Sequence, residues 1–162
     1  MIIRDATPDD LAAIAPVFRD IVADGDTYAF PEDLADDQIA ALWMPPAPGH
    51  CFVAYAADGT FLGTATVGPN RPGRGDHLAN ASFMVSPAAQ GKGVGRALAE
   101  TVLAWAKNQG YAAMVFNAVV ETNMGAVALW QQLGFRILAT VPAAFRSRSH
   151  GLVGMHVMYR EL

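Results

Sequence analysis

Three glycines stand where a helical pattern begins, in the segment "QGKGVGRALAE" from Gln90 to Glu100. Glycine weakens a helix, so its repetition at a helix start indicates that bare backbone is needed there. The first turn of a helix presents N–H groups without partners and carries a partial positive charge. Glycines let an anion approach these groups closely, so the segment predicts a phosphate-binding loop. A plain tight turn is the structural alternative.

The spacing of the glycines excludes the two common nucleotide-binding motifs. A Walker A loop needs Ser or Thr after its lysine, whereas Gly93 follows Lys92 in this chain. A dinucleotide-binding fingerprint needs a third glycine where Arg96 stands, and an acidic residue about 20 positions further on, where the chain is apolar. The pattern that does fit is Gln-x-x-Gly-x-Gly, formed by Gln90, Gly93 and Gly95.

Two asparagines interrupt apolar segments that have the composition of strands. Asn80 lies in the segment leading to the glycine loop, and Asn117 lies within "AMVFNAVV". Burial of an unpaired amide costs about 1–3 kcal/mol, so an asparagine in a central strand needs a hydrogen-bond partner. That partner is either backbone or a buried water in a structural role, or the polar groups of a bound molecule in a functional one.

The glycine pattern resembles the acetyl-CoA signature of the GNAT family of N-acetyltransferases. A second segment, "NMGAVALWQQLGF", is similar to a helix motif of the same family, and the opening "IIRDATPDDLAAI" is typical of it. The matched positions of the helix motif are Asn123, Ala126, Leu129, Gly134 and Phe135. The resemblance covers nearly the whole chain and implies an acyltransferase that uses acetyl-CoA as co-substrate.

The resemblance also implies a role for each matched segment. The residues expected to hold the pyrophosphate of CoA are Gln90, Gly91, Lys92, Gly93, Val94, Gly95 and Arg96. Met84 and Val85, at the end of the preceding strand, are expected to pair their backbone with the pantetheine arm. The N–H of Val85 is expected to polarise the thioester carbonyl. Asn123 is expected to bond the cofactor near its pantetheine, to cap the helix that follows, or to do both.

Two positions depart from the family pattern. Trp130 stands where the family usually has a tyrosine that protonates the departing thiolate, and an indole N–H cannot act as that acid. A thiol has a pKa of about 8.5, so a thiolate can leave without being protonated. The strand before the glycine loop carries no carboxylate to act as general base. His77 and Glu121 are the alternatives for that role.

Asn80, Asn117 and Asn123 look similar to the azetidine-2-carboxylate, or proline-analogue, branch of the family. That branch implies a small cyclic imino acid as acceptor, held by asparagines in place of a carboxylate base. Tyr28, Arg146 and Arg148 lie in expected loops and are candidates to bind the acceptor's carboxylate, and solvated arginines in a loop are the structural alternative. The expected activity is acetyl transfer to a small amino or imino acid. The alternatives are acetylation of a peptide or protein N-terminus or of another small amine, and a sensor that binds acyl-CoA without catalysis.

Hydrophobic spacing and turn signals define the elements that must position these residues. They predict the order β-α-α-β-β-β-α-β-α-β-β, in which residues 78–85 form the strand before the glycine loop. The expected fold is α/β (α+β), with a mixed central sheet of about seven strands and helices on both faces, as in the GNAT fold. "AAMVFNAVV" is predicted to be a strand buried on both faces. "PAAFRSRSHG" is predicted to be a loop between strands at residues 135–141 and 152–159.

Composition limits the class of protein. The chain has 162 residues, of which 52% are hydrophobic, and this predicts one domain over residues 1–162. A net charge of −4 argues against a nucleic-acid partner, and no apolar run reaches the roughly 18 residues of a membrane helix. Cys51 is the only cysteine, and no His, Asp or Glu spacing indicates a metal site. We expect a cytoplasmic protein with a small-molecule partner and no metal, and a homodimer is a candidate assembly.

Overall fold

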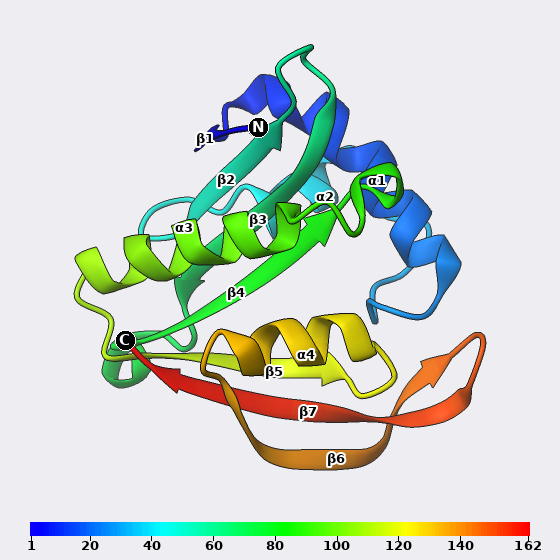
Figure 1. The fold of residues 1–162 in the computed structure, drawn as a ribbon, viewed down its shortest axis with the longest axis vertical. Coiled ribbons are helices and arrows are strands. Elements are labelled where there is room, and N and C mark those ends of the chain that lie inside the picture. The colour runs from blue at the N-terminus through cyan, green and yellow to red at the C-terminus, as the bar shows by residue number, and fades with distance from the viewer.

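Seven strands form one mixed sheet in the computed structural model, which describes residues 1–162 (Figure 1). The strands are β1 (Ile2–Asp5), β2 (His50–Tyr55), β3 (Phe61–Pro69), β4 (Leu78–Val85), β5 (Ala113–Val120), β6 (Arg136–Ser147) and β7 (Gly151–Glu161). The helices are α1 (Leu11–Asp24), α2 (Asp36–Trp43), α3 (Val94–Asn108) and α4 (Met124–Gln132). This order of elements confirms the predicted one.

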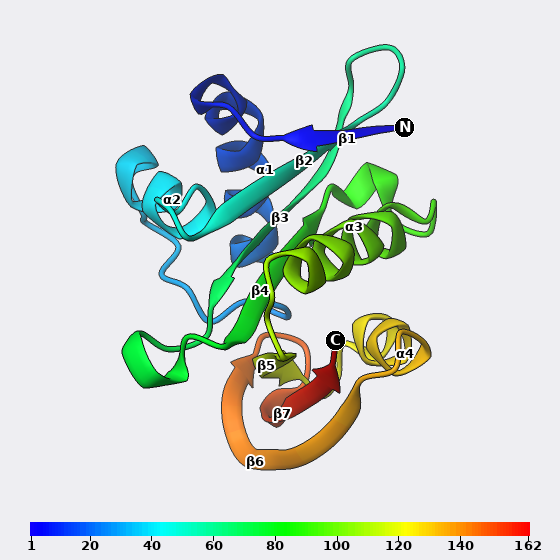
Figure 2. The same ribbon diagram turned by 90° about the vertical axis from the view of Figure 1, so that its left-hand side faces the viewer.

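Helices cover both faces of the sheet (Figure 2). On one face, α1 and α2 pack through a core that includes Phe18, Trp43 and Met84. On the other face, α3 buries Leu98 and Val102, two members of the apolar stripe that its spacing of three and four residues produces. None of the helices combines the length and the hydropathy that crossing a bilayer would require.

The strand order is β1-β2-β3-β4-β5-β7-β6, and every neighbouring pair is antiparallel except β4 and β5. The parallel pair is short, because only Leu78 pairs with Ala113 and Ala79 with Met114. Beyond these residues β4 continues along β3 and β5 continues along β7, so the two strands diverge (Figure 1). The divergence leaves one edge of β4 without a strand partner. We call this edge the open edge of β4, and the candidate site lies along it.

The prediction that "PAAFRSRSHG" forms a loop is wrong, because β6 continues to Ser147 and the turn to β7 is only three residues long. The register of β6 against β7 shifts between Val141 and Phe145, and Ala143 adopts a φ of 50°. This bulge absorbs Pro142, whose missing N–H costs no ladder bond in a strand at the edge of the sheet.

The prediction that β5 is buried on both faces holds only for its first half. Met114 and Phe116 are buried, whereas Asn117 and Ala118 are exposed. The register against β7 shifts between Phe116 and Val119, and β4 has already left β5 at this point. An apolar run cannot indicate that its neighbouring strand turns away, so this exposure has no signal in the sequence.

Candidate active site

The backbone of the glycine loop that precedes α3 adopts conformations that would be strained in residues with a side chain. Gly91 and Gly93 have φ values of 73° and 80°, and Gly93 is the residue that caps α3. A Cβ added at either position would meet no atom within 4 Å, so the space beside the loop is open. Both glycines therefore keep the backbone accessible and allow a turn that other residues rarely adopt.

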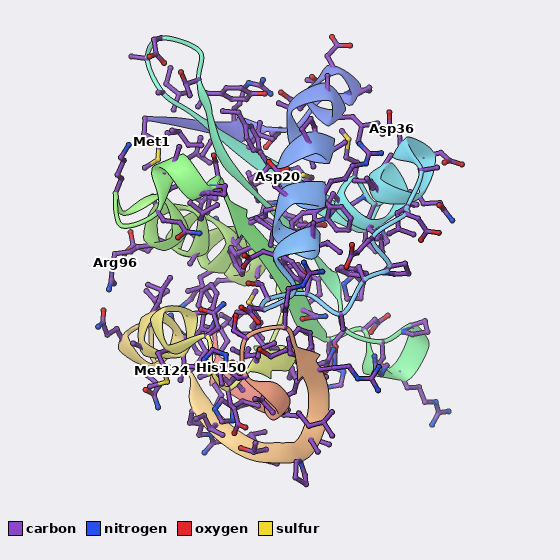
Figure 3. All side chains as sticks on the ribbon, turned by 90° about the vertical axis from the view of Figure 1, so that its right-hand side faces the viewer. Met1, Asp20, Asp36, Arg96, Met124 and His150 are labelled. Atoms are coloured by element: carbon purple, nitrogen blue, oxygen red, sulfur yellow. The ribbon has the colours of Figure 1, made fainter.

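The same loop carries a group of N–H donors that have no acceptor in the protein. These donors are the N–H groups of Gly91, Gly93, Val94, Gly95 and Arg96. The N–H of Lys92 differs, because it donates to the carbonyl of Ala89 at 3.4 Å, and the side chain of Gln90 is exposed. Arg96 extends outward from the first turn of α3 (Figure 3). Convergent free donors at a helix N-terminus fit a pyrophosphate group, the ligand that the sequence predicts.

The open edge of β4 presents a second set of backbone groups. In an antiparallel pair, backbone groups alternate between the partner strand and the opposite side. The N–H of Ser86 donates to Leu62 at 2.9 Å on the β3 side, whereas the carbonyl of His77 accepts from Ala112 at 2.9 Å on the β5 side. Phe83 and Val85 therefore direct their N–H groups toward the divergence of β4 and β5.

Because of this alternation, the backbone groups of Met84 and Val85 face opposite edges of β4. The N–H of Val85 faces the divergence, as the resemblance implies. Met84 pairs with Thr64 of β3, and its side chain is 1% exposed in the core under α1 and α2. Its backbone is thus directed away from the open edge, so the expected contact with pantetheine is not available to Met84. The N–H of Phe83, which sequence reasoning missed, faces the open edge instead.

Trp130 is the centre of an aromatic cluster beside this edge. Its ring lies 4.8 Å from the centroids of both Phe83 and Phe116, and 6.1 Å from that of Phe135. Trp130 is 7% exposed. The cluster links α4 to the facing sides of β4 and β5, so Trp130 acts as core and as a wall of the divergence, and supplies no titratable group.

Amide side chains gather at the other end of the divergence. Asn117 donates from Nδ2 to Oδ1 of Asn70 at 2.7 Å. Asn70 directly follows β3, so this bond spans the start of β4, the strand that carries Asn80. The carboxamide of Asn80 is half-buried and makes no hydrogen bond within the protein. Asn70 is a further polar residue that sequence reasoning missed, because nothing in its own loop distinguishes it.

Tyr28 reaches the open edge from the segment between α1 and α2. Its hydroxyl donates to the carbonyl of Phe83, and its ring packs edge-on against Trp43 at 6.0 Å. Burial raises the pKa of Tyr28 well above its usual range, so the hydroxyl stays protonated. Arg146 is exposed on β6, where it alternates with the buried Phe145 and Ser147. Its side chain leaves the strand on the opposite face, and its predicted contact with an acceptor remains a prediction.

Comparison with known proteins identifies the family of this fold. The family described as Acetyltransferase (GNAT) matches residues 15–135. The chain belongs to the GNAT family. This confirms the family that the glycine loop and the α4 motif predicted, and it confirms the assignment as an acetyl-CoA-dependent acyltransferase at the level of the family.

Solved structures of GNAT proteins share the whole fold. A GCN5-related N-acetyltransferase from Kribbella flavida superposes with a TM-score of 0.97 at 54% identity, over 99% of this chain and 97% of that one. YncA from Salmonella typhimurium, solved with its cofactor acetyl-CoA, has a TM-score of 0.89 at 25% identity, over 100% of this chain and 94% of that one. These similarities confirm the predicted mixed sheet flanked by helices.

Two curated relatives are also similar in sequence. N-acetyltransferase aca1 of Schizosaccharomyces pombe is 36% identical over 105 residues, which make up 65% of this chain and 50% of that protein. L-methionine sulfoximine/L-methionine sulfone acetyltransferase of Pseudomonas aeruginosa is 33% identical over 148 residues, 86% of this chain and 83% of that protein. The chain therefore spans only half the length of the first of these relatives.

Asn123 and Glu121, two of the three remaining polar candidates of this GNAT domain, have structural partners. Asn123 accepts from the N–H of Ala126 at 3.2 Å and so caps α4, which leaves its Nδ2 free for a ligand. Glu121 accepts from the N–H of Gly154 at 2.5 Å and thereby joins β5 to β7. His77 is exposed just before β4, roughly 26 Å along the strand from Val85. His77 is thus too far from Val85 to act as a base there, whereas the role of Glu121 as a base acting through water remains a prediction.

Proposed function

We propose that this GNAT protein transfers the acetyl group of acetyl-CoA to the amine of a small amino or imino acid. The observation that carries the proposal is the divergence of β4 and β5, which has the glycine loop on one face of the sheet and the asparagine amides on the other. The glycine loop and Trp130 lie on the side of α3 and α4. Asn80 shares the opposite face of β4 with Met84, which packs under α1 and α2. The two sides meet at the free N–H groups of Phe83 and Val85.

Each residue has a defined task in this proposal. When bound, acetyl-CoA supplies an acetyl thioester that an amine can attack. The free N–H groups from Gly91 to Arg96 hold the negative charge of the pyrophosphate. The N–H groups of Phe83 and Val85 bind the pantetheine and stabilise the negative charge that develops on the thioester oxygen. Much of the rate comes from holding the neutral amine in contact with the carbonyl carbon.

The absence of an acid at position 130 is compatible with this chemistry. A thiol pKa of about 8.5 allows the sulfur to depart as a thiolate near neutral pH. Trp130 then contributes only shape, by packing against Phe83 and Phe116. The amine arrives from solvent in its neutral form, and the proton that it loses as the amide forms returns to solvent, directly or through a water at Glu121.

The amides support an amino or imino acid as the acceptor. A carboxamide offers both a donor and an acceptor, so Asn80 and Asn117 together can bind an amine and a carboxylate without carrying charge. The Pseudomonas relative is named for acetylating two derivatives of methionine, which supports an acceptor of amino-acid size. The resemblance of Asn80, Asn117 and Asn123 to the proline-analogue branch supports the narrower proposal of a cyclic imino acid. Tyr28, whose hydroxyl is occupied, would line this pocket through its ring.

A thiol-release assay with acetyl-CoA tests the proposal across a panel of amino acids, proline analogues and short peptides. We expect release with one or more free amino or imino acids. The second candidate is a non-catalytic sensor, favoured by the lack of a positioned acid or base. Tight binding of CoA by calorimetry, with no thiol release from any amine, would replace the enzyme with the sensor.

A further inference from the structure

One segment, residues 25–32, connects the open edge of β4 to the turn between β6 and β7, and we call it the strap. At one end it reaches the turn between β6 and β7 through Asp26. The Asp26 carboxylate accepts three hydrogen bonds, from Ser147 Oγ at 2.6 Å, from the N–H of Ser149 at 3.0 Å and from Ser149 Oγ at 2.5 Å. Figure 3 shows His150, in this turn, below the end of α1. The turn and the strap therefore form one hydrogen-bonded unit.

Backbone contacts reinforce this unit. The N–H of Arg148 donates to the carbonyl of Gly25 at 3.1 Å. Gly25 has a φ of 78°, and a Cβ there would lie 3.0 Å from the Cβ of Arg148, so only glycine allows this approach. Ser147 is 3% exposed, and its hydroxyl also accepts from the N–H of His150 at 2.9 Å. An ion pair between Arg148 and Glu32 at 3.0 Å is fully at the surface and contributes little.

The other attachment of the strap is to β4. Tyr28, two residues after Asp26, donates to the Phe83 carbonyl on the open edge of β4 and packs against Phe30 at 5.6 Å. The strap thus runs from β4 to the β6–β7 turn, on the face that carries Asn80. It therefore crosses the acceptor side of the divergence between Phe83 on the open edge of β4 and the β6–β7 turn.

We propose that the Asp26 contact to Ser147 and Ser149 determines acceptor size, by holding the strap across the acceptor side so that free amino or imino acids enter and peptides do not. The inference rests on the proposed function. A free amino acid ends at a carboxylate close to its amine and fits beneath a closed strap. A peptide continues from the same position, and its second residue has to pass through the place that the strap occupies.

The test compares Asp26→Ala with Glu32→Ala, which alters the same strap but removes only the surface ion pair. The measured quantity is the ratio of kcat/KM for a dipeptide to kcat/KM for its free N-terminal residue. We expect Asp26→Ala to raise this ratio about 10-fold or more, since three hydrogen bonds are lost, with KM for acetyl-CoA unchanged. Glu32→Ala should leave the ratio as it is.

Amide hydrogen exchange provides a readout that does not depend on activity. The N–H groups of Arg148 and Ser149, which donate to Gly25 and Asp26, should exchange faster in Asp26→Ala than in Glu32→Ala. Faster exchange with an unchanged ratio overturns the inference and leaves the proposed function intact. A wild-type protein that acetylates the dipeptide as well as the free acid overturns it too. Absence of transfer to every amine overturns the proposed function itself. If Asp26→Ala fails to fold, Ser149→Ala makes the same comparison with one oxygen of Asp26 released.

Discussion

The carboxamides of Asn117 and Asn70 are joined by a hydrogen bond of 2.7 Å across the start of β4. Because Nδ2 of Asn117 is the donor, its Oδ1 is left to accept from another group. Asn70 therefore orients the Asn117 carboxamide, and in the proposed function the free oxygen would accept from an N–H of the acceptor.

The first prediction follows from this orientation. Asn70→Ala should lower kcat/KM for the acceptor about fivefold, the value of one neutral hydrogen bond of about 1 kcal/mol. The effect should be on the acceptor KM, with KM for acetyl-CoA unchanged, in steady-state kinetics. Asn70→Asp keeps an oxygen toward Asn117 and should recover most of the loss. Equal losses in both variants would show that Asn70 does not act through Asn117.

The second prediction concerns Asn80, whose carboxamide has no partner in the protein. Asn80→Ala should lower kcat/KM for the acceptor about 10–100-fold, the loss of one or two hydrogen bonds to substrate. The melting temperature should barely change, since no internal hydrogen bond is removed. A fall of several degrees with an unchanged acceptor KM would assign Asn80 to the structure instead. Asn117→Ala serves as the comparison, because it also breaks the bond to Asn70.

The third prediction uses two glycines with the same backbone strain at opposite ends of α3. Gly93 and Gly110 have φ values of 80° and 85°, and a Cβ on either would meet nothing within 4 Å. Replacement by Ala should therefore cost similar stability at both, about 1 kcal/mol. Only Gly93→Ala should raise the Kd for CoA, by about 10-fold, because it lies among the free N–H donors. Calorimetry and thermal melts check both parts, and an equal change in Kd for the two variants would contradict the phosphate-binding role.

The fourth prediction is that Trp130 contributes to stability and not to proton transfer. Trp130→Phe leaves a gap between Phe83 and Phe116 and should lower the free energy of unfolding by about 1–3 kcal/mol. The kcat should stay within a few-fold of the wild type, and the pH–rate profile should lose no basic limb. A large gain in kcat on Trp130→Tyr would mean that protonation of the thiolate limits the rate.

The fifth prediction is a pH dependence of the strap. Hydrogen bonds from Ser147 and then Ser149 lower the pKa of Asp26 to about 2 in the folded protein, against about 3.9 when unfolded. A lowered folded pKa adds stability that is complete above the unfolded pKa and is lost as the pH falls through the folded one. The difference in stability between wild type and Asp26→Asn should be constant from pH 7 to 5 and should shrink between about pH 4 and 2. Urea unfolding at each pH measures this difference in stability. An undiminished difference at pH 2 would show that ionisation of the Asp26 carboxylate is not its cause.

Local chemistry along the chain was enough to predict the glycine loop and the cap of α4. The glycine loop and the Asn123 cap depend on φ values and hydrogen bonds within a few residues, and the structure has both at the expected positions. The order of strands and helices follows from hydrophobic periodicity, which acts over one element at a time. For this reason the family, the fold and the position of the glycine loop could all be inferred without coordinates.

The acceptor side depends on contacts between distant segments, and only the tertiary structure decided it. Asn117 meets Asn70 across 47 positions of the chain, and Ser149 meets Asp26 across 123. The exposure of Asn117 and the free N–H of Phe83 both arise because β4 and β5 pair at only two residues before they separate. Strand register and strand divergence are set by the packing of the whole sheet, and no local preference of Asn, Ser or Asp encodes them.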